Sequence, residues 1–288
     1  MKGKIGLLIN PQKPKALEMG KRLLLWGREK GVTFLAPPHE AAVLGIPGVS
    51  DEEWKNQVEF AVVLGGDGTF LRAARYVLGK EIPLYGINVG RLGFLASGDP
   101  NSAEKDIDTI LEGRFTTQKR RLLKGTVTRG GSLVHEVYAL NDLVVTKGAF
   151  ARVITLQISV GQRPLSVMTG DGLILSTPTG STGYALSAGG PIIPPHVPCM
   201  LLVPICAHTL YARAMVFGDG DTIQIIPRGD HRDMMLTQDG QLGYELLPGD
   251  QIDVSLSREK SVTIILLPNR DYYGLLLEKF QGGQNVTE

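Results

Sequence analysis

A glycine-rich loop with one aspartate is the part of the chain best suited to chemistry. Gly65-Gly66-Asp67-Gly68-Thr69 follows the apolar run 60–64 and precedes a segment with apolar residues at helical spacing. Consecutive glycines let backbone N–H groups approach a phosphate, and a helix N-terminus favours an anion. The carboxylate of Asp67 repels phosphate unless a cation or a hydroxyl proton lies between them. The loop therefore predicts phosphoryl transfer, with Asp67 binding Mg²⁺ or accepting a hydroxyl proton, and a tight Asp-Gly turn is the structural alternative.

A second loop is rich in hydroxyl groups. Residues 176–184 read STPTGSTGY and hold five serine and threonine side chains among glycines, after an apolar run at 173–176. Hydroxyls and main-chain N–H groups suit ribose and phosphate oxygens, and Tyr184 offers a flat face to a base. The loop predicts a nucleotide contact, and an ordinary connector is the alternative.

Two polar residues, Asn141 and Asp142, interrupt the apolar stretch 137–145, which we expect to belong to one strand at 135–145. Polar side chains inside a strand need partners, so the pair predicts either a ligand contact or a structural hydrogen-bond network. Residues 88–95 follow another strand and predict a further wall of a nucleotide cleft, with an ordinary glycine loop after a strand as the alternative. By themselves, Asp171 and Asp239-Gly240-Gln241 indicate only turns.

The elements that must position these loops differ between the two halves of the chain. Apolar strands are predicted at 5–9, 31–35, 60–64 and 82–87, and helices at 15–30 and 70–78, with a loop after Pro37-Pro38. Continuous apolar strands alternating with helices are typical of a parallel sheet covered on both faces. From about Leu122, short strand candidates and glycine turns predict a β-sandwich instead. These candidates are 125–128, 135–145, 153–160, 173–176, 222–226 and 251–256.

Composition excludes several classes of protein. The 30 Lys+Arg and 29 Asp+Glu residues leave a formal net charge of +1, too small to attract nucleic acid or an anionic membrane. The hydrophobic fraction of 43% fits a globular protein, and no apolar run approaches the roughly 18 residues of a membrane span. The two cysteines and five histidines show no zinc-type spacing. We expect a soluble cytoplasmic protein.

Taken in order, these motifs resemble the NAD kinase family over roughly residues 4–280. The GGDG loop alone is shared with diacylglycerol, sphingoid and 6-phosphofructo kinases, whereas its combination with TPTGSTGY and the Asn-Asp pair is highly specific. The resemblance implies transfer of the terminal phosphoryl group of ATP to the 2′-hydroxyl of the adenosine ribose of NAD, giving NADP, with a divalent metal (Mg²⁺). It also implies a homo-oligomer, a dimer or a tetramer, and the small net charge predicts no nucleic acid or membrane partner.

The resemblance assigns roles to individual residues. Asp67 is the catalytic base or orienter of the hydroxyl, and Asp171 lies near the nicotinamide end. The remaining cofactor-binding residues are Gly66, Gly68 and Thr69 around the phosphates, Asn141 and Asp142 at the adenosine, Thr179, Thr182, Gly183, Tyr184 and Ser187 in the adenine and ribose loop, and Phe70 and Gln241 without a more specific role. No residue is assigned as a metal ligand. Gly183 stands where many members have Ala, and Asp142 where Glu is commoner, which would alter affinity.

The resemblance also completes the fold prediction. We expect an α/β N-terminal domain (1–105) with the GGDGT loop, a β-sandwich-like NAD-binding domain (106–268), and a C-terminal segment (269–288) that packs back on the first domain. Two other functions share part of this pattern: another kinase of the GGDG superfamily, acting on a lipid or sugar, and a non-catalytic NAD-binding regulator. Incubation with ATP, Mg²⁺ and NAD separates them by the appearance of NADP.

Overall fold

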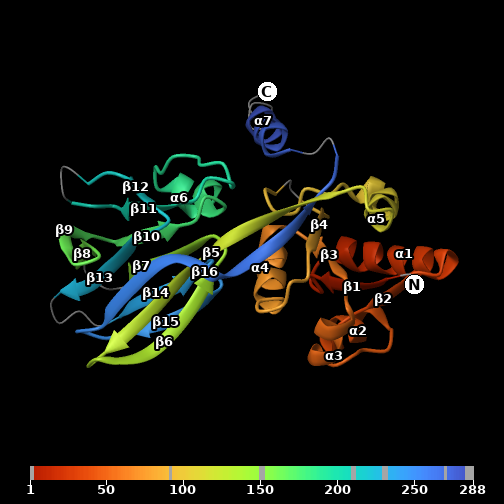
Figure 1. Ribbon diagram of the computed structural model, residues 1–288, viewed down its shortest axis with the longest axis horizontal. Helices are drawn as coiled ribbons and strands as arrows, with labels where there is room; N and C mark the ends of the chain where they lie inside the picture. Colours follow the sequence, from red (N-terminus) through yellow and green to blue (C-terminus); the bar gives the residue numbers. More distant parts are fainter. Residues whose placement is uncertain are drawn as a thin grey trace. The chain divides into compact units, whose positions relative to one another are not determined.

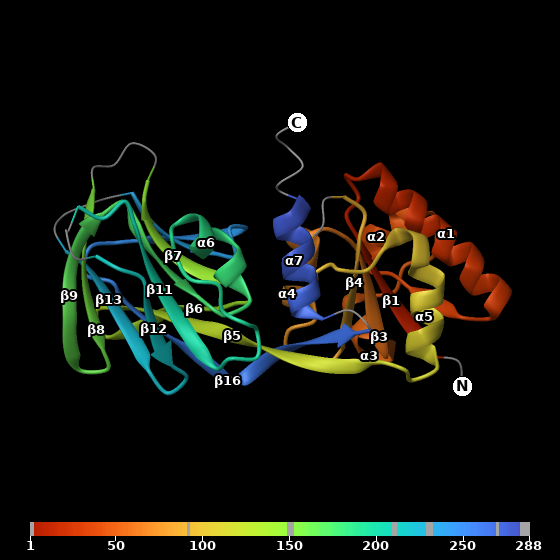
Figure 2. The same cartoon turned by 90° about the horizontal axis from the view of Figure 1, so that it is seen from above.

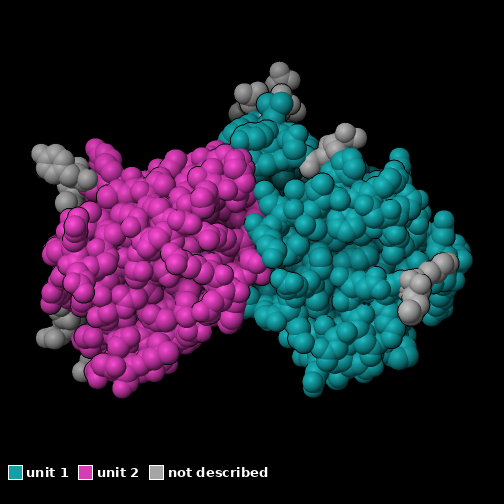
Figure 3. All heavy atoms as spheres, in the orientation of Figure 1, with its two compact units in different colours: residues 1–119, 262–288 teal, residues 120–261 magenta. Residues whose placement is uncertain are grey.

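The computed structural model describes residues 3–90, 93–148, 153–208, 212–228, 233–268 and 271–282. The chain forms two compact units, one of residues 1–119 and 262–288 and one of residues 120–261 (Figure 3). This division differs from the predicted boundaries after residues 105 and 268. The chain passes between the units inside two continuous strands, so no glycine- or proline-rich linker marks either crossing in the sequence.

The first unit is an α/β domain. Its parallel strands lie in the order β2-β1-β3-β4, and Ile264 of β16 pairs in parallel with Leu84 at the free edge of β4. The elements of this unit are β1 (Lys4–Ile9), α1 (Pro14–Lys30), β2 (Thr33–Leu35), α2 (Pro38–Leu44), α3 (Asp51–Gln57), β3 (Phe60–Gly65), α4 (Asp67–Tyr76), β4 (Leu84–Asn88), the 3-10 turn η1 (Pro100–Ser102), α5 (Ala103–Leu111) and α7 (Tyr272–Gly282). The predicted parallel sheet is confirmed.

Helices cover both faces of this sheet (Figures 1 and 2). On one face, Ile5, Leu7 and Ile9 of β1 share a core with buried residues of α1 and α5. On the other face, Gly6 lies against Trp54 of α3 and Gly86 against Phe70 of α4. Because side chains alternate along a strand, a strand buried on both faces must be apolar throughout, as β3 is.

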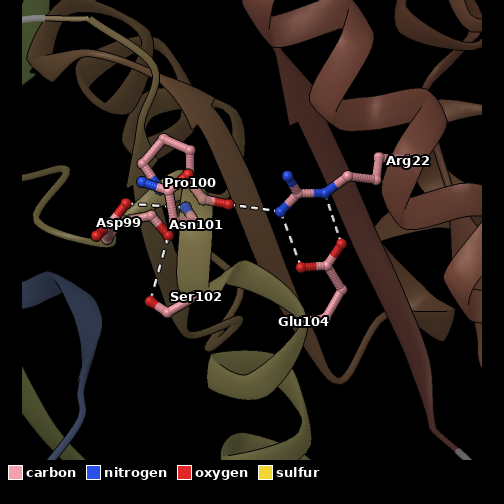
Figure 4. A network of polar contacts seen from close by, with 6 residues as sticks. All are labelled: Arg22, Asp99, Pro100, Asn101, Ser102 and Glu104. Atoms are coloured by element: carbon pink, nitrogen blue, oxygen red, sulfur yellow. Dashed lines mark hydrogen bonds and ion pairs between the residues drawn. The ribbon is translucent and has the colours of Figure 1, made fainter.

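The packing of α5 on α1 is fixed by a polar network (Figure 4). The guanidinium of Arg22 on α1 pairs with the carboxylate of Glu104 at 2.5 Å and donates to the carbonyl oxygen of Pro100. Asp99 accepts from the backbone N–H of Asn101 at 2.8 Å, which begins the turn before the helix. An Asp-Pro start followed by apolar residues at helical spacing is the signal that identifies α5, which the sequence analysis missed.

The second unit is a sandwich of two sheets, as predicted. One sheet has the order β12-β11-β10-β7-β14-β15, and the other contains β16, β13, β8 and β9 with the β5–β6 hairpin. Buried apolar residues from both sheets form one core. The elements are β5 (Thr116–Arg129), β6 (Ser132–Ala139), β7 (Asp142–Lys147), β8 (Ile154–Val160), β9 (Arg163–Gly170), β10 (Gly172–Ser176), η2 (Gly180–Thr182), α6 (Tyr184–Ser187), β11 (Cys199–Ile205), β12 (Met215–Gly218), β13 (Thr222–Arg228), β14 (Met234–Gln238), β15 (Leu242–Leu246) and β16 (Gln251–Leu266).

Two local predictions are wrong, and one predicted strand is longer than expected. The single strand expected at 135–145 is two strands, β6 and β7, separated by a turn at Leu140-Asn141. The strand expected at 251–256 continues to Leu266, where its end joins the first unit's sheet. The loop expected after Pro37 is α2, because proline fits the first turn of a helix without losing a hydrogen bond.

The C-terminal helix α7 belongs to the first unit, as expected. The ring of Tyr272 lies 6.3 Å from that of Phe94, centroid to centroid, and the ammonium of Lys279 lies 4.4 Å from the centroid of the same Phe94 ring. Among the described residues, every helix is too short or too polar to span a bilayer.

Candidate active site

The GGDGT loop lies at the carboxyl edge of the first unit's sheet. Gly65 ends β3 and pairs with Asn88, the last residue of β4, and the N–H of Val89 donates to the carbonyl of Gly65 at 3.0 Å. Parallel strands end at the same edge, which is where open α/β sheets bind ligands. The structure thus brings the GGDGT loop and the start of segment 88–95 together, as the sequence indicated.

Asp67 is held by the backbone of that neighbouring segment. Its carboxylate accepts hydrogen bonds from the N–H groups of Phe94 (2.9 Å), Leu95 (3.0 Å) and Ala96 (3.2 Å). A Cβ built at Gly93 would lie 2.0 Å from Oδ1 of Asp67, so only glycine permits this approach. A carboxylate has about four acceptor directions, and three are occupied here. Asp67 therefore anchors residues 93–96 and keeps one direction for a further donor.

The other predicted residues of this loop differ in exposure. Gly66 is half-buried and Gly68 is exposed, so their backbone borders the open side of the loop. Thr69 and Phe70 are buried. The ring of Phe70 packs where a Cβ of Gly86 would stand, 2.8 Å from that position. The structure therefore places the Phe70 side chain in the core and leaves the open surface of the loop to Gly66 and Gly68.

In the second unit, Asn141 and Asp142 lie at the turn between β6 and β7. The buried carboxylate of Asp239 accepts from the backbone N–H groups of Leu140 (3.2 Å), Asn141 (2.7 Å) and Asp142 (3.2 Å). The N–H of Asp239 donates in turn to the carbonyl of Asp142 at 2.9 Å. Asp239 thus holds the turn that the sequence analysis placed inside a strand.

The hydroxyl-rich loop holds the carbonyl side of the same turn. The hydroxyl of Thr177 donates to the carbonyl of Leu140 at 2.6 Å, and that of Ser176 donates to the carbonyl of Asn141 at 3.1 Å. A Cβ built at Gly180 would lie 2.3 Å from the Asn141 carbonyl oxygen, so a side chain there would push the two segments apart. The hydroxyls of Ser176 and Thr177, which the sequence suggested for a nucleotide contact, therefore hold the backbone of the turn.

The remaining residues of the loop lie closer to its surface. Tyr184 is 47% exposed and Ser187 is exposed as well, while Gly183 lies beside the amide nitrogen of Asn141. Thr182 donates to the carbonyl of Thr179 at 3.4 Å, and Thr179 itself is buried.

The side chain of Asn141 has an unsatisfied acceptor. Its Oδ1 is buried and has no hydrogen-bond partner among the described residues. An unpaired buried amide oxygen costs about 1–3 kcal/mol, so such atoms are rare in folded proteins. A ligand that donates an N–H or O–H here would recover that energy.

Asp142 follows Asn141 at the turn and is only 5% exposed. Burial, followed by the negative charge of Asp239, raises the pKa of the Asp142 carboxyl from 3.8 to about 7. Near neutral pH this carboxyl is divided between a protonated form that donates and an ionised form that only accepts.

The raised pKa predicts a pH-dependent stability. The folded protein binds this proton between about pH 4 and pH 7, whereas the unfolded chain has released it. The contribution of Asp142 to the free energy of unfolding is therefore full below pH 4 and is lost as the pH rises through 7. Asp142→Asn should remove this dependence, flattening the slope by at most about 1.4 kcal/mol per pH unit between pH 5 and 7. Urea unfolding at pH 5, 6, 7 and 8 measures both slopes, and equal slopes contradict the assignment.

Two predicted site residues, Asp171 and Gln241, do not belong to the turn at Asn141 and Asp142. Asp171 precedes β10 and pairs with Lys147 at 3.4 Å, whereas Asp142 pairs with Ser176 at the other end of that strand. At about 3.3 Å per residue the two ends are roughly 15 Å apart. Gln241 is exposed and closes the turn that contains Asp239, with its N–H donating to the carbonyl of Gln238 at 2.9 Å.

Sequence reasoning missed Asp239 as the residue that holds the turn. The Asp239-Gly240 pair did indicate a tight turn, and the structure shows positive φ at both residues (50° and 61°), as a type I′ turn requires. What the pair did not reveal was the direction of the carboxylate. Over the described part of the chain, no group of three or more His, Cys, Asp or Glu side chains is placed to hold a metal ion.

Family models of known proteins match the segments of the chain that contain the two loops. A family model of the ATP-NAD kinase N-terminal domain matches residues 47–115, and one of the ATP-NAD kinase C-terminal domain matches residues 140–266. The NAD kinase of Moorella thermoacetica is 40% identical over 282 residues, 97% of this chain and 90% of that protein. The NAD kinase of Natranaerobius thermophilus is 37% identical over 284 residues, 98% of this chain and 99% of that protein.

Solved structures share the fold. A yeast NADH kinase complexed with NADH superposes with a TM-score of 0.90, covering 99% of this chain and 89% of that one at 24% identity. An NAD kinase from Archaeoglobus fulgidus in complex with ATP gives a TM-score of 0.77, covering 96% and 98% at 24% identity. With both family models matched and relatives of 37–40% identity along nearly its whole length, this chain belongs to the NAD kinase family.

Proposed function

We propose that this chain transfers the terminal phosphoryl group of ATP to the 2′-hydroxyl of the adenosine ribose of NAD, giving NADP. The family assignment supports the reaction. The choice of an adenosine acceptor rests on one observation, the buried and unpartnered Oδ1 of Asn141. The amino group of adenine is a donor of the kind this oxygen lacks.

The neighbouring groups suit the rest of an adenosine. The carboxyl of Asp142 adjoins the Asn141 amide in sequence and can accept from a ribose hydroxyl when ionised. The exposed ring of Tyr184 offers a stacking face to the base. Because Asp239, Ser176 and Thr177 fix the backbone of the turn, the Asn141 amide is positioned before any ligand arrives.

Asp67 is the proposed proton acceptor. The three N–H groups of residues 94–96 fix its carboxylate, and the remaining acceptor direction receives the 2′-hydroxyl proton. As the proton moves to Asp67, the ribose oxygen forms a bond to the γ-phosphorus. The bond from that phosphorus to the bridging oxygen breaks, and the electron pair leaves with ADP.

Mg²⁺, a cytoplasmic location and a homo-oligomeric assembly complete the proposal. Mg²⁺ commonly keeps several of its waters and binds through substrate phosphates, so the phosphates of ATP would hold the ion beside the GGDGT loop. When bound, the ion neutralises charge on the transferred phosphoryl group. Light scattering at micromolar concentration tests the assembly, and a monomer contradicts it.

A modified substrate tests the proposed acceptor. NAD that lacks only the 2′-hydroxyl should bind within about tenfold of NAD, because one hydrogen bond is worth about 1 kcal/mol, and should receive no phosphate. The 3′-deoxy analogue is the matched control and should still be phosphorylated. The assay follows phosphate transfer from ATP in the presence of Mg²⁺. Phosphate on the 2′-deoxy analogue, or on a diacylglycerol or sugar acceptor at a comparable rate, overturns the proposal.

A further inference from the structure

One ammonium group beside the GGDGT loop has no role in the reaction described above. Lys13 follows β1, and its Nζ lies 3.6 Å from the position of a Cβ at Gly66 and 3.5 Å from that of a Cβ at Gly90. These two glycines belong to the loops after β3 and β4. The ammonium therefore lies where the loops following three adjacent parallel strands meet.

The backbone of Lys13 is held firmly in this place. The N–H of Asn10 donates to the carbonyl of Leu64 at 3.0 Å, which ties the end of β1 to the end of β3. The side chain of Asn10 accepts from the N–H of Gln12, and its carbonyl accepts from the N–H of Lys13 at 3.1 Å. Pro14 follows and begins α1. Only the flexible side chain of Lys13 remains to adjust to a ligand.

The charge of Lys13 is not neutralised by the protein. Within the described ranges, its half-buried side chain has no carboxylate within ion-pair distance and no hydrogen-bond partner. The nearby carboxylate of Asp67 is engaged by the N–H groups of residues 94–96. Burying part of an unpaired ammonium is unfavourable, so its position between two glycine loops indicates an anionic partner.

We propose that Lys13 binds the phosphate chain of the phosphoryl donor. This inference rests on the proposed function, which requires a polyphosphate beside the GGDGT loop. The glycines admit phosphate oxygens to the backbone, and the ammonium supplies the positive charge that these oxygens need. The pyrophosphate of NAD offers the same chemistry, and we assign Lys13 to the donor because it lies in the unit that holds the GGDGT loop, whereas the proposed adenosine contacts lie in the other unit.

Charge removal at one position tests the assignment. Lys13→Met removes the charge and keeps the length of the side chain, and Lys13→Arg keeps the charge. Lys15→Met is the control, because it removes the charge of an exposed lysine two residues further along the chain. Lys13→Met should raise the KM for ATP by about 10- to 100-fold, as expected for one hydrogen bond between charged groups, and change the KM for NAD less than threefold. Lys13→Arg should recover most of the loss, and Lys15→Met should match the unchanged protein.

Direct binding separates this inference from the proposed function. Calorimetry with the non-hydrolysable analogue adenylyl imidodiphosphate should show the same 10- to 100-fold weakening for Lys13→Met, whether or not the protein makes NADP. If NADP forms but Lys13→Met leaves both the KM for ATP and analogue binding unchanged, the inference is wrong and the function stands. An increase confined to the KM for NAD assigns Lys13 to the acceptor and overturns it too. If no NADP forms with the unchanged protein, the function fails, and the calorimetry alone decides on Lys13.

Discussion

Asp67→Asn is expected to lower kcat by about 10²- to 10⁴-fold, the usual contribution of a positioned general base. The affinity for NAD should change little, because the proposed adenosine contacts lie at Asn141 and Asp142. Steady-state kinetics with ATP, Mg²⁺ and NAD give kcat, and calorimetry gives the affinity. Near-normal turnover removes Asp67 from the chemistry.

The contacts of Asp67 make a second variant necessary. Its carboxylate is the proposed proton acceptor and also anchors residues 94–96. An Asn side chain would turn an N–H group toward one of the three backbone donors. Gly93→Ala disturbs the same anchorage, because its Cβ would lie 2.0 Å from the carboxylate oxygen, yet it keeps the carboxylate. We expect a loss of turnover for Gly93→Ala that is at least tenfold smaller than for Asp67→Asn. Equal losses indicate that Asp67 acts only by holding the segment.

Asp239→Ala is expected to destabilise the second unit by at least about 3 kcal/mol and to abolish measurable NAD binding. The change leaves the N–H groups of Leu140, Asn141 and Asp142 without their acceptor, and each buried unsatisfied donor costs about 1–3 kcal/mol. Alanine also tolerates the positive φ of 50° poorly. Urea unfolding measures the free energy, and calorimetry measures NAD binding.

Asp239→Asn is the variant that keeps the test decisive if the alanine protein does not fold. Asparagine tolerates positive φ and its Oδ1 can still accept from Asn141 and Asp142, so the expected loss is smaller, about 1–2 kcal/mol. Loss of the Asp239 charge should also lower the pKa of Asp142, although burial still keeps that pKa raised. Unchanged stability and unchanged NAD affinity in the asparagine variant contradict the proposed role of Asp239.

The sequence by itself determined the parallel strands of the first unit and the position of both loops in the chain. A strand buried on both faces is apolar along nearly its whole length, and β1, β3 and β4 therefore stood out from the helices between them. The GGDGT and TPTGSTGY loops were visible for a related reason. Glycines and hydroxyl residues concentrated at the end of an apolar strand are typical of phosphate- and nucleotide-binding loops. The order of these motifs along the chain then indicated the family.

The sequence did not determine which groups hold the functional residues, because those bonds join distant parts of the chain. Asp67 is bonded to residues 27–29 positions further on, and Asp239 to residues 97–99 positions earlier. An aspartate in an Asp-Gly turn has the same local pattern whether its carboxylate faces water or a buried backbone. The turn at Asn141 was predicted to lie inside a strand, because the residues that hold its backbone, Asp239 and Thr177, are distant in the sequence. Lys13 gains its place beside Gly66 and Gly90 only when β1, β3 and β4 pair in register. Helix and strand propensity depend on residues that are close in the sequence. The partners of a buried carboxylate or of a single ammonium depend instead on which strands pair in the folded chain.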